Sequence, residues 1–125
     1  MEPLLEGCRI LIVEDEYVLA MELHSSLESA GATVVGPVGS IDDALSVLEH
    51  ATELDAAVLD VNLRGQKVFA VADALRERGV PFIFTTGYGR ASFPDRYADV
   101  PRCEKPFEAQ DLAQALQGHI KPRPH

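Results

Sequence analysis

Two apolar segments of this sequence each lead directly into carboxylates. Residues 8–13, CRILIV, are followed by Glu14, Asp15 and Glu16, and residues 56–59, AAVL, are followed by Asp60. A charge at the end of a buried segment costs several kcal/mol unless another group compensates it. If these carboxylates meet in the fold, their mutual repulsion calls for a cation or for protonation. Oxygen ligands without a nearby histidine or cysteine favour Mg²⁺ over zinc.

Two other apolar segments end in groups that suit a bound phosphate. Residues 82–85, FIFT, lead into Thr86, and the segment that begins at residue 100 ends at Lys105. A small cation beside a carboxylate, a hydroxyl and a lysine suits phosphoryl transfer, because that reaction depends on positioning and on neutralising charge. Asp60 is the candidate nucleophile.

Five strand-length apolar segments position these groups. They span residues 9–13, 33–35, 56–59, 82–85 and 100–103. Between most of them, apolar residues recur at three- and four-residue intervals, which predicts helices. Strands that alternate with helices form βαβ units, so we expect one parallel sheet covered on both faces. Ligands bind such sheets at the carboxyl ends of the strands, where Glu14, Asp60, Thr86 and Lys105 all lie.

Small residues mark the limits of the predicted helices. Gly31 and Gly79 follow two of the periodic segments, as expected at helix C-termini. Ser40 together with Asp43 predicts a capped helix start. Residues 87–99, GYGRASFPDRYAD, contain two glycines and a proline without helical spacing. There we predict a loop with at most a short helix.

The composition predicts a single cytoplasmic domain. The chain has 125 residues, 46% of them hydrophobic, with neither a membrane-length apolar run nor the basic start of a signal peptide. Acidic residues outnumber basic ones 20 to 11, which argues against nucleic-acid binding. Cys8 and Cys103 lie far apart and the four histidines form no ligand pair, so neither residue type predicts a metal site.

Four short motifs together resemble the receiver domain of two-component response regulators. They are the acidic pair in LIVEDE, the strand-end aspartate in VLDVNL, the threonine with a small residue in FTTG, and KPF. Each motif is weak by itself, but all four occur in order, with βα units between them, over about residues 8–120. The longer segment FTTGYG is similar to the signature of a subgroup of stand-alone receivers called the FAT GUY group.

The resemblance implies a flavodoxin-like, doubly wound α/β fold. Its five parallel strands would follow the order 2-1-3-4-5, flanked by about five helices of which the fourth is short or irregular. It further implies that residues 1–125 form one receiver domain, with a core at about residues 8–120 and no output domain.

The resemblance also assigns roles to the acidic groups. Asp60 would accept a phosphoryl group and form an acyl phosphate. Asp15 and Asp60 would bind Mg²⁺ directly. The main-chain carbonyl of Asn62 would complete the protein ligands, and Glu14 would act mostly through water.

The switch residues follow from the same resemblance. The hydroxyl of Thr86 would donate to a phosphoryl oxygen, and Gly87 would leave room for it. Lys105 would supply positive charge, and its peptide bond to Pro106 would be cis. Phosphorylation adds about 1.5 to 2 negative charges, which Thr86 and Lys105 would then approach.

Two positions depart from the receiver pattern. Many receivers have an aromatic residue three positions before the lysine, where this chain has Arg102. In receivers the ring of that aromatic residue moves with the switch threonine and so reports phosphorylation. We hypothesise that Arg102 itself, or one of Tyr88, Tyr97 and Phe107, provides this readout of phosphorylation here. The proline that commonly follows the third strand is missing, and residues 63–65, LRG, take its place. We therefore expect a more mobile turn there.

The predicted function is phosphorylation-dependent signalling rather than enzyme catalysis. A sensor histidine kinase or a histidine phosphotransfer protein would donate the phosphoryl group to Asp60. The chain would act as a monomer or homodimer and would contact a downstream protein through residues 87–99, the fifth strand and the fifth helix. Diffusible output, phosphate sink and relay intermediate are all compatible with the sequence.

Two other classes of protein share some of these features. A small phosphatase of the haloacid-dehalogenase type also uses a strand-end aspartate and Mg²⁺. That class places its nucleophile on the first strand with a second aspartate two residues on, whereas here Asn62 stands two residues after Asp60. A flavin carrier of similar topology needs a phosphate-binding loop after its first strand, where Glu14 and Asp15 would repel a phosphate.

Overall fold

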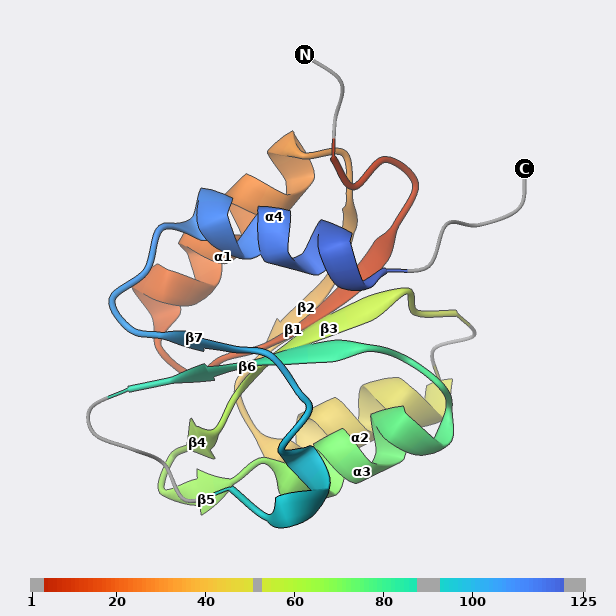
Figure 1. The fold of residues 1–125 in the computed structure, drawn as a ribbon, viewed down its shortest axis with the longest axis vertical. Coiled ribbons are helices and arrows are strands. Elements are labelled where there is room, and N and C mark those ends of the chain that lie inside the picture. Colours follow the sequence, from red (N-terminus) through yellow and green to blue (C-terminus); the bar gives the residue numbers. More distant parts are fainter. Residues whose placement is uncertain (1–3, 51–52, 88–92, 121–125) are drawn as a thin grey trace.

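Five parallel strands form the central sheet, in the order β2-β1-β3-β6-β7 (Figure 1). They are β1 (Arg9–Val13), β2 (Thr33–Val38), β3 (Ala56–Asp60), β6 (Phe82–Thr86) and β7 (Arg102–Glu104). The computed structural model describes residues 4–50, 53–87 and 93–120. Counted along the chain, the strands of this sheet follow the order 2-1-3-4-5. The predicted fold class and strand order are therefore confirmed.

Four α-helices in the described part of the chain cover the two faces of the sheet. One face carries α1 (Tyr17–Ser29) and α4 (Ala109–His119), and the other carries α2 (Ile41–His50) and α3 (Phe69–Glu77) (Figure 1). The predicted cap of α2 is present, since the main-chain N–H of Asp43 donates to Oγ of Ser40 at 3.1 Å. None of the helices in the described ranges combines the length and the apolar character needed to cross a bilayer.

The predicted short fourth helix is a single 3₁₀ turn, η1 (Asp95–Tyr97). Pro94 occupies the position before this turn, where its missing N–H is harmless. β7 begins at Arg102, a few residues after η1 ends, so no further helix lies between η1 and this strand. The helix count of about five is thus met by four α-helices and one 3₁₀ turn within the described residues.

The core consists of two apolar layers, one on each side of the sheet. β3 and β6 are buried along their whole length, and successive residues of a strand face opposite sides. Leu59 and Phe84 pack in the layer beneath α2 and α3, whereas Val58 and Ile83 pack in the layer beneath α1 and α4. Burial on both faces explains why these strands are continuous apolar runs in the sequence.

Tyr97 is fully buried in the layer beneath α3. Its ring stacks on Phe69 with a centroid separation of 5.4 Å. Its hydroxyl lies in hydrogen-bond contact with the carboxylate of Asp73 and, at 3.1 Å, with the main-chain carbonyl of Phe69. Arg96 also pairs with Asp73, at 3.0 Å. Tyr97, one of the hypothesised readout residues, therefore fastens η1 to α3 in this structure.

A short hairpin that the sequence analysis did not predict follows β3. β4 (Asn62–Leu63) pairs antiparallel with β5 (Gln66–Lys67). The two residues between them, Arg64 and Gly65, have φ angles of 49° and 83°. Positive φ at both central positions is the geometry of the tight turn whose twist matches that of a hairpin. The turn that lacks the usual proline is thus a regular hairpin, and its expected mobility stays a prediction.

Candidate functional site

The register of the sheet brings the predicted site residues to one edge. Val13 pairs with Leu59, so Glu14 and Asp60 follow neighbouring positions of β1 and β3. Thr86 pairs with Glu104, which places Lys105 just beyond the end of β7. The main-chain N–H of Lys105 also donates to the carbonyl of Thr86 at 2.7 Å. The expected convergence of these groups is therefore present.

Three carboxylates and one ammonium group form the centre of this edge. Oxygens of Glu14, Asp15 and Asp60 all lie within 4.8 Å of one another. Glu14 and Asp60 are only 3% and 5% exposed, and Asp15 lies nearer the surface. Nζ of Lys105 lies 3.0 Å from Oε1 of Glu14 and 3.2 Å from Oδ2 of Asp60. One ammonium group thus faces three carboxyl groups.

Each of the three carboxylates also accepts a hydrogen bond from a main-chain N–H. Asp60 Oδ1 accepts from Asn62 at 3.2 Å, and Glu14 Oε2 accepts from Glu16 at 3.0 Å. Asp15 Oδ2 accepts from Arg64, which is 49 residues away in the sequence, at 2.9 Å. Such bonds stabilise the charged form and orient each carboxylate. This role of Arg64 was not predicted from the sequence. The signal was a two-residue turn ending in glycine between two short extended segments.

Burial and crowding change the protonation of Glu14. Desolvation, and then the hydrogen bond with Asp60, raise the pKa of Glu14 to about 7. Burial alone would lower the pKa of Lys105, but its contacts with Glu14 and Asp60 outweigh that effect and raise it. Without a bound cation, the cluster therefore reduces its negative charge by holding a proton on Glu14 near neutral pH.

The raised pKa of Glu14 predicts a pH-dependent loss of stability in the metal-free protein. A carboxyl group with a higher pKa in the folded state binds more protons when folded, so the free energy of unfolding falls as pH rises. For Glu14 the fall should extend from about 4.5, its ordinary pKa, to about 7. Urea unfolding in the presence of a chelator, repeated across this pH range, measures the free energy of unfolding. That free energy should fall more steeply with pH in the wild type than in Glu14→Gln. A constant difference between the two proteins would contradict the raised pKa.

The donor atoms of the cluster fit a hard divalent cation. All of them are oxygens, and the described residues contribute no histidine or cysteine to the group. Mg²⁺ prefers carboxylate and carbonyl oxygens and keeps several waters, so it tolerates a site that is open on one side. The excess of negative charge over Lys105 gives such a cation a net attraction.

Of the predicted switch residues, Lys105 already contacts Asp60, whereas no hydrogen bond joins Thr86 to Asp60 in the described part of the chain. Thr86 is 5% exposed, and its hydroxyl donates to the carbonyl of Gly87 at 3.3 Å. A Cβ at Gly87 would meet no atom of the described residues within 4 Å. The peptide bond between Lys105 and Pro106 is cis, as expected.

The structure places two of the other residues that were hypothesised to report phosphorylation. The exposed side chain of Arg102 lies over the ring of Phe93, with its guanidinium carbon 3.7 Å from the ring centroid. This contact joins β7 to the segment before η1. Phe107 lines a cavity near Lys105, and Tyr88 lies outside the described residues.

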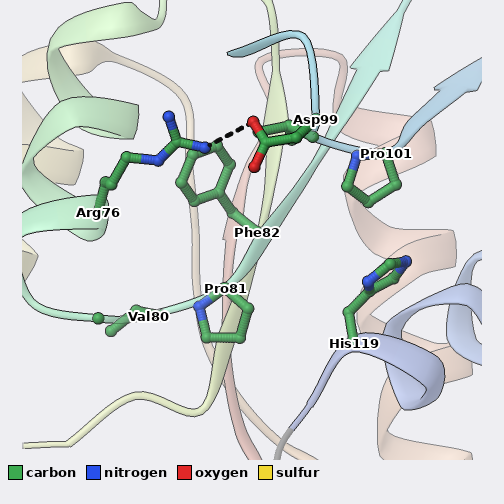
Figure 2. A pocket seen from close by; sticks show the side chains of 9 residues that line it. Arg76, Val80, Pro81, Phe82, Asp99, Pro101 and His119 are labelled. Carbon is green, nitrogen blue, oxygen red and sulfur yellow. Dashed lines mark hydrogen bonds and ion pairs between the residues drawn. The ribbon is translucent and has the colours of Figure 1, made fainter. Parts of the chain in front are cut away.

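A separate cavity of about 270 Å³ lies at the opposite edge of the sheet. It is lined by residues that precede or begin β6 and β7, including Pro81, Phe82 and Pro101, with His119 at its side (Figure 2). Arg76 and Asp99 form an ion pair of 3.1 Å across it (Figure 2). None of the predicted site residues lines this cavity.

Known proteins resemble this chain over most of its length. SdrG from Sphingomonas melonis Fr1, solved in solution, is 45% identical and superposes with a TM-score of 0.77 over 87% of this chain and 92% of its own. The transcriptional regulatory protein PdtaR of Mycobacterium tuberculosis is 28% identical over 87% of this chain and 55% of its own length. The phyllosphere-induced regulator PhyR of Methylorubrum extorquens is 29% identical over 86% of this chain and 41% of its own length.

The chain thus spans about half the length of the curated relatives that it matches. The family model of the response regulator receiver domain matches residues 10–117. That range contains the acidic cluster, the hairpin after β3, Thr86 and Lys105. From its sheet order, its acidic edge and this match, the chain belongs to the response regulator receiver domain family.

Proposed function

We propose that this receiver domain accepts a phosphoryl group on Asp60 in a Mg²⁺-dependent reaction. The observation that carries the proposal is the setting of the Asp60 carboxylate. It is almost fully buried, its Oδ2 contacts Lys105, and it lies within 4.8 Å of the carboxylates of Glu14 and Asp15. A buried carboxylate of this kind destabilises the folded state. A role as phosphoacceptor would explain why the chain has one at this position.

The proposed reaction needs an in-line approach of a phosphohistidine to Asp60. A carboxylate oxygen of Asp60 attacks phosphorus, the P–N bond to the donor imidazole breaks, and the imidazole leaves with the electron pair and takes up a proton. The product is an acyl phosphate. Asp15, Asp60 and the carbonyl of Asn62 would hold Mg²⁺, with Glu14 acting through water. The cation would neutralise charge on the phosphoryl oxygens.

Thr86 and Lys105 would convert phosphorylation into a change of shape. The ammonium group of Lys105 already contacts Asp60 at 3.2 Å, so it can pair with a phosphoryl oxygen after a small movement. The hydroxyl of Thr86 would exchange its weak bond with the Gly87 carbonyl for a stronger bond to the phosphoryl group. Because Thr86 ends β6 and Lys105 follows β7, both movements act on the segment between these strands.

The surface beside Lys105 suits a protein that donates the phosphoryl group. Tyr17, Val18 and Met21 on α1 are 76%, 64% and 38% exposed. A cavity of about 380 Å³ next to them is lined by Glu16, Val18, Lys105 and Phe107, among others. An exposed apolar patch beside a reactive group marks an interaction site. A sensor histidine kinase or phosphotransfer protein would dock here, while a downstream protein would bind residues 87–99, β7 and α4.

Membership of the receiver family argues against the phosphatase alternative. Receiver domains are in general signalling proteins, and the second catalytic aspartate of that phosphatase class is replaced here by Asn62. We expect the only chemistry of the chain to be its own phosphorylation and dephosphorylation.

Intact mass spectrometry tests the proposed function directly. The full chain, exposed to acetyl phosphate with Mg²⁺, should gain one phosphoryl group, and a chelator should prevent the gain. Borohydride reduction followed by peptide mapping should place the group on Asp60. A phosphohistidine protein serves as the second donor, because some receivers ignore small phosphodonors. No adduct from either donor, or an adduct that forms equally well without Mg²⁺, would contradict the proposal.

A further inference from the structure

The turn of the β4–β5 hairpin contacts the acidic cluster through its main chain. The N–H of Arg64 donates to Oδ2 of Asp15 at 2.9 Å. The side chain of Arg64 lies beside Gly39, where an added Cβ would come within 3.5 Å of its guanidinium and of Cα of Asp15. Arg64, Gly39 and Asp15 therefore adjoin one another, although they belong to three different loops.

The hairpin is anchored on both sides of this turn. Leu63 is 1% exposed and packs in the layer beneath α2 and α3. The N–H of Val68 donates to the carbonyl of Val61 at 3.0 Å, and the N–H of Val61 donates to the carbonyl of Thr85 at 3.0 Å. The base of the hairpin is thus tied to β6, so the position of its turn is set by the core.

The pairing of the hairpin directs the main chain of Asn62 outward. Leu63 and Gln66 are the pair that flanks the two-residue turn, and Asn62 pairs with Lys67. Along two antiparallel strands, pairs of residues whose main-chain N–H and carbonyl groups bond each other alternate with pairs whose N–H and carbonyl groups point away from the partner strand. Leu63 and Gln66, which close the two-residue turn, form main-chain hydrogen bonds to each other. The main-chain N–H and carbonyl of Asn62, one residue earlier, therefore point away from β5. Its N–H indeed donates to Asp60 instead, at 3.2 Å.

We infer that the β4–β5 hairpin is the positioning element of the cation site. Its turn holds Oδ2 of Asp15 through the N–H of Arg64, and its first residue turns the carbonyl of Asn62 toward the side that carries Asp60. Arg64 and Gly65 act as positioning residues and contact no phosphoryl group. This inference rests on the proposed function, since it concerns the Mg²⁺ that the acidic cluster would bind.

The positive φ of Gly65 makes the inference testable without touching a ligand residue. The φ of Gly65 is 83°, and a Cβ added there would meet no described atom within 4 Å. A side chain at this position therefore acts only through the backbone conformation. Valine avoids this region of φ, whereas asparagine tolerates it. Gly65→Val should distort the turn, and Gly65→Asn should preserve it.

Gly79 provides a matched control at the far end of α3. Its φ is 71°, and a Cβ there would likewise meet nothing within 4 Å. Gly79→Val therefore imposes a similar backbone strain away from the acidic edge. Any general loss of stability should be shared by the two valine variants, while an effect on the cation site should belong to Gly65→Val alone.

The test is a titration of the ¹⁵N-labelled 125-residue chain with MgCl₂, followed by NMR. Gly65→Val should weaken Mg²⁺ binding by about tenfold, the scale typical of lost support around metal ligands. Gly65→Asn and Gly79→Val should stay within about twofold of the wild type. In the wild type, the Arg64 amide proton should resonate downfield because it bonds a carboxylate, and Asp15→Asn should move it upfield. If Gly65→Val folds poorly, Gly65→Ala supplies a milder strain for the same comparison.

The outcomes separate this inference from the proposed function. Saturable Mg²⁺ binding by the wild type, with unchanged affinity in folded Gly65→Val or Gly65→Ala, would overturn the positioning role alone. Equal weakening in Gly65→Val and Gly79→Val would also overturn it, because the effect would then be one of stability. Absence of saturable Mg²⁺ binding in the wild type would overturn the metal-dependent function and the positioning role together.

Discussion

Asp60→Asn is expected to abolish the phosphoryl adduct completely. An amide oxygen is a far poorer nucleophile than a carboxylate, and no other carboxylate has the same contacts. Glu14 also contacts Lys105, but in the metal-free protein its pKa is raised to about 7 by burial and by Asp60, and Asp15 has no contact with Lys105 among the described residues. Intact mass after treatment with acetyl phosphate and Mg²⁺ should therefore equal that of the untreated variant.

The same substitution should change the cation site in two measurable ways. Removing one of three neighbouring negative charges relieves repulsion, so the metal-free protein should be more stable at neutral pH. Losing a ligand should weaken Mg²⁺ binding by at least tenfold. Asp42→Asn, at an exposed position in the first turn of α2, is the control and should keep both the adduct and the affinity. An adduct of normal yield on Asp60→Asn would place the phosphoacceptor elsewhere.

Lys105→Met should cause the largest loss of stability among substitutions at the acidic edge. The ammonium group contacts Glu14 and Asp60, and its side chain is 20% exposed, while theirs are 1% and 7% exposed. Removing one partner of a buried ion pair leaves uncompensated charge and typically costs about 3 to 5 kcal/mol. We expect about 3 kcal/mol, the lower end of that range, because Lys105 is partly exposed and Glu14 can take up a proton.

Urea unfolding of the metal-free protein measures this loss. The loss should be larger above pH 7 than well below it, since Glu14 with its pKa of about 7 is charged only at the higher pH. Mg²⁺ should restore part of the stability, because the cation supplies the missing positive charge. Lys67→Met, at an exposed lysine of β5, is the control and should change stability little. Equal effects of the two substitutions would mean that Lys105 does not compensate the cluster.

The order of strands and helices could be predicted from the sequence because it depends on local patterns. Strands such as β3 and β6 are buried on both faces and therefore appear as unbroken apolar runs. The start of α2 was predicted correctly, because the bond between Ser40 and Asp43 involves residues that are three apart. The end of β2 and the start of β7 were less accurate, since pairing with neighbouring strands sets those limits.

The surroundings of Tyr97 could not be predicted from local sequence patterns. Tyr97 was one of several aromatic residues that suited a switch, but the structure buries it against Phe69 and Asp73. Its hydroxyl partner Asp73 lies 24 residues earlier, on α3. Only the packing of η1 onto α3 distinguishes Tyr97 from an aromatic side chain that is free to move.

The sequence by itself determined that Glu14, Asp15, Asp60, Thr86 and Lys105 would share one edge of a parallel sheet. Each of them ends or follows an apolar strand, and parallel strands place their carboxyl ends together whatever the details of packing. Tertiary structure alone decided how the carboxylates are oriented. Asp15 is held by the N–H of Arg64, 49 residues away, and that contact exists only because a positive-φ turn places a backbone donor beside a distant loop. Strand-end positions follow from local hydrophobicity, whereas hydrogen bonds between loops depend on where the whole chain brings them.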